Sequence, residues 1–211
     1  MKLLKKVNVI EVKRAFIVSQ LVRLARGKRR YLGLLSKSDF KKKLKAAKTK
    51  VFKLKEEKLD KIIANEWKKR LKAYNSSEWY LGEVSTNKIG VWKRAGGLPL
   101  SWTNGSLKAT AQKVKHAFDT SPKLVKKRAR HSIYNILETN VVELQKEKYL
   151  FPIIFKSGTG TKGRKGLRTS MRGDIDDGCM RAVALTIFGF KRIKAYIGYP
   201  KNIKNNLASS K

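Results

Sequence analysis

Positive charge constrains this chain more than any other feature of its sequence. Its 211 residues include 51 Lys and Arg against 15 Asp and Glu, which gives a formal net charge of +36. Charges of one sign repel each other when a chain compacts, so a fold with this composition calls for a neutralising partner. Nucleic acid is the most common polyanion that such a protein binds. The charge excludes an ordinary free enzyme as the first interpretation and favours a nucleic-acid-binding protein.

The chain still has enough apolar residues to build a core. Hydrophobic residues make up 41% of it and aromatic residues 9%, more than a disordered basic tail contains. A single cysteine, Cys179, excludes a disulfide framework and a cysteine-based zinc module. No apolar run approaches the roughly 18 residues of a membrane span. We therefore expect no metal, no cofactor, no membrane and no small-molecule substrate.

The first half of the chain has the pattern of lysine-rich helices. Apolar spacing predicts one helix over residues 2–26 and a second over about 38–74, followed by short strands at 79–84 and 88–93. Lysines crowd the second helix with no acid until Glu56, which favours phosphate contact over a merely solvated face. Since these lysines repel one another, we expect residues 1–74 to become ordered on a polyanion or against neighbouring proteins.

The second half changes from a helical to an extended pattern. A helix is predicted over about 106–118, and Ser121 with Pro122 begins another. After about residue 148 the apolar period becomes two, which is typical of strands. The predicted strands cover 149–156, 169–176, 183–188 and 192–197, with a turn at Gly189 and a stop at Pro200.

These patterns predict an α+β protein in which Lys-rich N-terminal helices precede a C-terminal domain of two helices packed on a small antiparallel sheet. We expect a basic helical region with a loop-rich connector over 1–105, an α+β RNA-binding domain over 106–200 and a polar tail over 201–211.

A glycine- and cation-rich segment at 157–169 invites comparison with a phosphate-binding P-loop. A P-loop ends in Gly-Lys-Ser/Thr before a helix, whereas Lys165 precedes Gly166 and a strand-like run. We interpret the segment instead as a basic hairpin tip that reaches into an RNA groove. Glycines allow close backbone approach there and cations meet phosphates.

Three carboxylates, Asp174, Asp176 and Asp177, lie within four residues. A nuclease would use such a group to hold Mg²⁺, and alternation places Asp174 and Asp176 on one face of a strand. The structural interpretation is a capped turn before Gly178 with an ion pair to Arg172 or Arg181. Because no general base is placed nearby, we favour the structural interpretation and expect no catalytic residue.

The C-terminal sequence resembles the signature of the universal third protein of the small ribosomal subunit. That signature runs roughly Leu-Arg-Ala-Asp-Ile-Asp-Tyr-Gly, then Ala, then Thr-Tyr-Gly and Ile/Val-Lys-Val-Trp-Ile. The matching segments here are Met171-Arg-Gly-Asp-Ile-Asp-Asp-Gly178, Ala182, Thr186-Ile-Phe-Gly189, Ile193-Lys-Ala-Tyr-Ile197, Lys127-Arg-Ala129 and Phe155-Lys-Ser-Gly158.

The resemblance covers about residues 106–200, and two extra residues are needed between Ala182 and Thr186. It implies helices on a small antiparallel sheet, bound to ribosomal RNA in the head of the small subunit near the messenger entry. Residues 1–105 have no clear counterpart of the family's N-terminal KH domain, and Asp177 replaces the family's tyrosine.

Taken together, the sequence predicts a non-catalytic structural constituent of the small ribosomal subunit that braces ribosomal RNA. Its partners would be that RNA and neighbouring small-subunit proteins. The ribosome is the expected location, with a mitochondrial version suggested by the basic first 30 residues and cytoplasmic or virion-associated settings as alternatives. Two other functions stay open: a viral or chromatin-type packaging protein and a Mg²⁺-dependent nuclease. The predicted phosphate contacts are Arg23, Arg26, Lys28, Arg29, Arg30, Lys126, Lys127, Arg128, Arg130, Lys162, Arg164, Lys165 and Arg168.

Overall fold

The computed structural model confirms an α+β protein. It describes residues 2–27, 37–91, 94–103, 106–128, 133, 137, 153–157 and 173–201, of which 22–27, 37–41, 126–128, 153–157 and 173–174 are described by their backbone alone. The elements are β1 (Lys2–Val7), α1 (Val9–Gly27), α2 (Lys37–Phe52), α3 (Glu56–Asn75), β2 (Ser77–Ser85), α4 (Leu107–Thr120), α5 (Pro122–Arg128), β3 (Ile153–Ser157), β4 (Gly173–Asp177), α8 (Cys179–Ile187) and β5 (Arg192–Pro200). Short 3₁₀ turns at Thr86–Lys88 and Ala95–Gly97 lie between β2 and α4.

The sheet joins the two halves of the chain. Its strand order is β1-β2-β5-β3-β4, and the neighbours pair antiparallel except for β3 and β5, which are parallel. The sheet differs in two details from the small antiparallel sheet expected in the C-terminal half. One pairing is parallel, and the N-terminal half contributes β1 and β2. The sheet thus crosses the boundary that the sequence suggested near residue 105.

The N-terminal prediction needs two corrections. Residues 2–7 form strand β1 rather than the start of a helix, and helix α1 follows Asn8, whose side chain accepts a hydrogen bond from the Ile10 N–H at 2.9 Å. The predicted 38–74 helix is also two helices, because the chain turns at residues 53–55. There the carbonyl of Leu54 accepts a hydrogen bond from Arg14 of α1 at 3.3 Å, so packing against α1 fixes a break that no Gly or Pro marks.

The C-terminal half contains one further error of prediction. Residues 183–188 were expected as a strand, but 179–187 form the buried helix α8. A short apolar run between two glycines fits either a buried strand or a buried helix, and periodicity does not separate them. The strand at 79–84 is confirmed within β2, whereas 88–93 contributes only a 3₁₀ turn and an isolated bridge at Gly90 in its described part.

The other C-terminal predictions are confirmed where they can be followed. Helix α4 begins after Ser106, whose hydroxyl accepts from the Ala109 N–H at 3.1 Å, and Pro122 opens α5. Gly189 has a positive φ of 87° at its turn, and Pro200 ends β5. The predicted hairpin tip at 158–169 and the tail at 202–211 lie outside the described residues.

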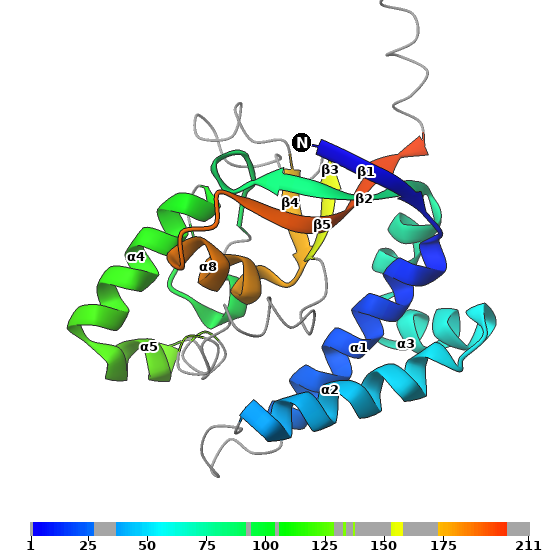
Figure 1. The fold of residues 1–211 in the computed structure, drawn as a ribbon, viewed down its shortest axis with the longest axis horizontal. Coiled ribbons are helices and arrows are strands. Elements are labelled where there is room, and N and C mark those ends of the chain that lie inside the picture. Colours follow the sequence, from blue (N-terminus) through cyan, green and yellow to red (C-terminus); the bar gives the residue numbers. More distant parts are fainter. Residues whose placement is uncertain are drawn as a thin grey trace, which may run out of the picture.

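Two hydrophobic clusters cover opposite faces of the sheet. Along β5, Ile193, Ala195 and Ile197 belong to the cluster under α4 and α8, while Tyr196 packs against the cluster formed with α1, α2 and α3. Successive side chains of a strand point to opposite faces, so these contacts define two sides. Figure 1 shows α4, α5 and α8 gathered toward one end of the sheet and α1–α3 toward the other.

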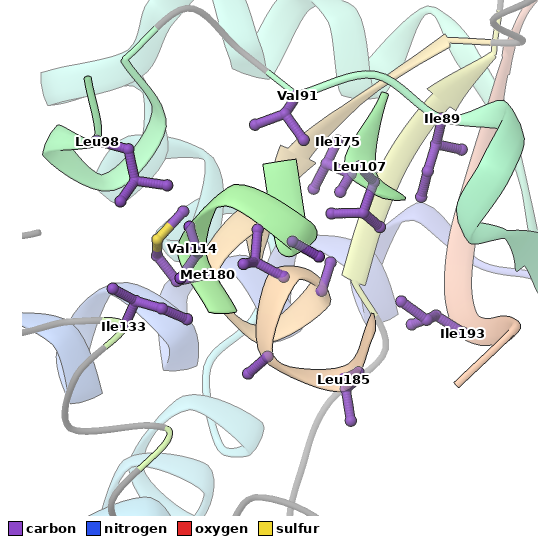
Figure 2. Close-up of a cluster of buried hydrophobic side chains, with 14 of the residues drawn as sticks. Ile89, Val91, Leu98, Leu107, Val114, Ile133, Ile175, Met180, Leu185 and Ile193 are labelled. Atoms are coloured by element: carbon purple, nitrogen blue, oxygen red, sulfur yellow. The ribbon is translucent and has the colours of Figure 1, made fainter. Parts of the chain in front are cut away.

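The first cluster draws on distant parts of the chain. Figure 2 shows Val114 of α4, Met180 of α8 and Ile175 of β4 with Ile89, Val91 and Leu98 from the segment between β2 and α4, and all six are buried. The second cluster closes the N-terminal half around Val12 and Phe16 of α1, Leu44 of α2 and Leu59 of α3. The expectation that residues 1–74 become ordered on a polyanion or against neighbouring proteins stays a prediction, and these helices share a buried core with β2.

Candidate nucleic-acid interface

Acidic side chains hold the fold together from within. Lys13 of α1 is a buried lysine, its side chain only 1% exposed, and its Nζ lies 2.8 Å from Glu56 Oε1 and 2.6 Å from Asp60 Oδ1. Glu56 and Asp60 are one turn apart on α3, so they meet the same ammonium group. The pairing matches two of the chain's few carboxylates with an internal cation, although both stay partly exposed, and joins α1 to the start of α3.

A second internal ion pair connects α3 to the sheet. Asp176 of β4 is 2% exposed and accepts hydrogen bonds at 2.7 Å from both Arg70 Nε and the Tyr74 hydroxyl. The Arg70 guanidinium also lies over the Phe16 ring, 4.6 Å from its centroid. Burial and the Asp176 carboxylate raise the pKa of Tyr74 well above its ordinary value, so the phenol stays protonated as the donor of this contact.

The neighbouring carboxylate, Asp177, joins α1 to α8. It accepts a hydrogen bond from Gln20 Nε2 at 3.1 Å and pairs with Arg181 Nη2 at 3.2 Å. This i,i+4 pair is one of the two arginine partners that the sequence suggested. Burial lowers the pKa of Arg181, and Asp177 opposes that shift.

These contacts bear on the nuclease interpretation. Asp176 and Asp177 are both occupied by cationic or hydrogen-bonding side chains, whereas the side chain of Asp174 is not among those described. Within the described part of the chain, no three His, Cys, Asp or Glu side chains come together as a metal-binding group. The geometry supports a structural role for Asp176 and Asp177, as brackets between the N-terminal helices and the β4–α8 unit.

The outward face of α2 is a stripe of lysines. We call three lysines of α2, Lys42, Lys45 and Lys50, with Lys53 in the turn just after the helix and the small residues Ala46 and Thr49 between them, the α2 stripe; together they line a shallow hollow. All six residues are exposed, and no ion pair to the four lysines is found among the described residues. The opposite face of the helix, with Leu44, Ala47 and Val51, is buried.

Other exposed cations are interleaved with acids. On α3, the exposed lysines Lys58 and Lys68 share the outer surface with Glu57 and Glu66. On α4, Lys115 pairs with Asp119 at 2.6 Å, one turn away. A nearby carboxylate weakens the field that a phosphate would meet, so these surfaces are poorer anion sites than the α2 stripe.

The aromatic residues of the connector serve the core rather than an open stacking surface. Trp79 is buried and its Nε1 donates to the Tyr74 carbonyl at 2.9 Å, and Trp102 packs against the C-terminal cluster. Tyr80 meets Tyr199 edge to face with ring centroids 5.9 Å apart. The preference for packing over base stacking is confirmed for these residues, while Trp92 lies outside the described ones.

The predicted phosphate contacts fall mostly outside the described side chains. The backbone places two of them on the last turns of α1 and three on α5, and the other eight lie outside the described residues, so the set as a whole stays a prediction. Sequence reasoning noted the lysine run of α2 but left it out of the predicted site, although Lys45 and Lys50, three and eight residues after Lys42, fall on the same helix face. On α1 lie Arg23 and Arg26; on α5 lie Lys126, Lys127 and Arg128; outside lie Lys28, Arg29, Arg30, Arg130, Lys162, Arg164, Lys165 and Arg168.

No helix among the described residues is long and apolar enough to cross a membrane. Comparison of the chain with protein-family models, curated proteins and solved structures gives no significant match.

Proposed function

We propose that this protein is a non-catalytic RNA-binding protein that braces folded RNA by neutralising its phosphates, as a structural constituent of the small ribosomal subunit. The observation that carries the RNA-binding part is the separation of charge: Glu56, Asp60, Asp176 and Asp177 are used in internal pairs. The ribosomal part rests on the resemblance of residues 106–200.

Separation of charge has a direct electrostatic consequence. A carboxylate that is already paired with a cation does little to offset the lysines elsewhere, so the chain's net charge of +36 stays available to attract a polyanion. Condensed counterions leave a nucleic acid when lysines replace them, and their release provides most of the affinity of such a protein. The Arg70–Asp176 and Gln20–Asp177 contacts connect the N-terminal helices α3 and α1 to the C-terminal strand β4. Bound RNA would therefore contact one connected folded unit.

The test measures the binding of the purified full chain to a folded ribosomal RNA fragment by fluorescence anisotropy at several salt concentrations. If on the order of eight phosphates are neutralised, log K should fall with log salt with a slope of about −6 to −7. A slope near zero would refute the electrostatic mechanism. Co-sedimentation of the native protein with the small ribosomal subunit tests the ribosomal assignment separately.

Two controls address the alternatives from the sequence. Equal or tighter binding to DNA under the same salt conditions would favour a packaging protein. Incubation of RNA and DNA with the protein and Mg²⁺ or Mn²⁺ should leave both intact. Cleavage by the wild type that is lost in Asp174→Ala would favour the nuclease.

A further inference from the structure

We infer that the α2 stripe is a docking site for the sugar–phosphate backbone of double-helical RNA. This inference rests on the proposed function, since it identifies where on the protein RNA is held. It also goes beyond the sequence prediction, which favoured phosphate contact for the lysine run of this helix but named its phosphate-contact residues on other segments and identified neither a face nor a type of RNA. Figure 1 shows α2 on the side of the molecule away from the sheet, where a long ligand has access to it.

The geometry of the stripe fits an extended anion. Lys42 and Lys50 are eight residues apart on α2, which corresponds to about 12 Å along a helix axis, and Lys53 follows in the turn directly after the helix. Helix α2 packs on α1 through Leu44 and Val51, so the lysines of the stripe lie on the opposite, outward face of α2. A rigid row of cations with this length covers several successive phosphates of a nucleic-acid duplex, in which charges recur every few ångströms along the axis.

The centre of the stripe allows close approach. Ala46 and Thr49 lie between the lysines, and their short side chains leave the hollow that the four stems border. A backbone can therefore come near the helix while the ammonium groups reach its phosphates from either side. The Thr49 hydroxyl adds a neutral hydrogen-bond donor for a phosphate or sugar oxygen.

The composition of the stripe favours a duplex backbone over exposed bases. Readers of single strands stack bases on aromatic side chains, and no aromatic residue lines this hollow. Recognition of bases by hydrogen bonding also uses Asn, Gln or Arg, which are absent from the lining as well. Lysine, threonine and alanine supply charge, one hydroxyl and space, so the site should be indifferent to sequence.

The local charge pattern explains why α2 rather than α3 is the site. No Asp or Glu occurs between Phe40 and Lys55, whereas Glu57 and Glu66 lie among the exposed lysines of α3. Helix α3 also has a kink at Trp67, where φ is −138° and ψ is 46°. The α2 stripe therefore contains no acid, and α3 has enough lysines for a control variant with the same number of substitutions.

The experiment compares full-length variants with matched charge. The stripe variant replaces four lysines by glutamine: Lys42→Gln, Lys45→Gln, Lys50→Gln and Lys53→Gln. The control variant makes the same change on α3: Lys58→Gln, Lys61→Gln, Lys68→Gln and Lys72→Gln. A third variant carries Arg at the four stripe positions and keeps their charge. Circular dichroism establishes that each is folded, and anisotropy with a labelled blunt-ended RNA duplex gives affinity against salt.

We expect the stripe variant to lose about three to four units of the salt slope, since each neutralised phosphate contributes about 0.9. Between 50 and 200 mM salt the stripe thus accounts for roughly a hundred-fold change in affinity. The α3 variant should lose less than about one unit, because its lysines touch few phosphates. The arginine variant should bind like the wild type, and duplexes of different sequence should be affected equally.

Each failure has its own meaning. Equal losses in the α2 and α3 variants would overturn the stripe as a site and leave RNA binding by general charge in place. A loss seen only with single-stranded RNA would overturn the duplex assignment. A wild-type protein without salt-dependent binding to any RNA would overturn both the stripe and the proposed function.

Discussion

The ion cluster of Lys13, Glu56 and Asp60 makes an asymmetric prediction about stability. Lys13 is almost fully buried, with 1% of its side chain exposed, whereas Glu56 is 44% and Asp60 30% exposed. Removal of the lysine leaves two carboxylates that can turn to water. Removal of both acidic charges leaves an ammonium group inside the bundle without a countercharge. The two perturbations break the same contacts but should differ in cost.

The magnitudes follow from burial. An uncompensated buried charge typically lowers stability by about 3–5 kcal/mol, so we expect a loss in this range for Glu56→Gln with Asp60→Asn. Replacement of a buried ion by an apolar residue of similar volume is often neutral or stabilising. For Lys13→Met we therefore expect a loss of no more than about 1 kcal/mol. The triple variant should recover most of the stability that the double variant loses, because it no longer buries a charge.

Urea denaturation followed by circular dichroism measures the differences in free energy of unfolding, and thermal melting followed in the same way gives the melting temperatures. In a chain of this size, about 1 kcal/mol shifts the melting temperature by roughly 2–4 °C. The double variant should therefore melt about 6–20 °C below the wild type. If Lys13→Met destabilised the protein as much as Glu56→Gln with Asp60→Asn, the burial argument would be refuted, and the pair would instead stabilise the bundle by attraction alone.

Two further predictions concern the aromatic groups beside the sheet. The pKa of Tyr74 is raised in the folded protein, so its phenol keeps a proton that the same phenol in the unfolded chain releases above about pH 10. The free energy of unfolding should therefore fall as the pH rises past that value. Denaturation midpoints measured from pH 8 to 11 should fall less steeply in Tyr74→Phe than in the wild type, since the lysines titrate in both. In Gly198→Ala the new Cβ would lie 2.7 Å from the Trp79 ring. Because Trp79 is buried and hydrogen-bonded, the substitution should lower the free energy of unfolding by about 1–3 kcal/mol, measured from a melting curve. An unchanged melting temperature would mean that the ring moves freely.

The sequence contains local signals that would have corrected two of the predicted helix boundaries. Asn8 followed three residues later by Glu11 is an N-terminal capping pattern, and the structure starts α1 there. Glu56 and Glu57 end an acid-free run, as expected for the first turn of a new helix. The apolar pattern through residues 2–26 obscured the first signal, and the absence of Gly or Pro obscured the second.

The remaining differences depend on contacts that no local pattern encodes. Strand β5 pairs with β2 on one edge and with β3 on the other. Along the chain, β2 lies more than a hundred residues before β5, and β3 about forty residues before it. Likewise, Asp176 was expected to pair within its own segment, but its partners Arg70 and Tyr74 come from α3. Alternation correctly separates Asp176 from Ile175, yet only the tertiary fold determines which helix meets each face.

The shared sheet also determines how the two halves depend on each other. A fragment beginning after residue 85 would lack β1 and β2, and β5 would then present an unpaired edge with Ile193, Ala195 and Ile197 on one of its faces. Unpaired edges promote association with other chains. The N-terminal bundle in turn buries Trp79 from β2 and packs against Tyr196 from β5. Each half completes a layer of the other, so the lysine-rich helices are part of the folded body rather than an extension, and the α2 stripe is held in a fixed position relative to the sheet.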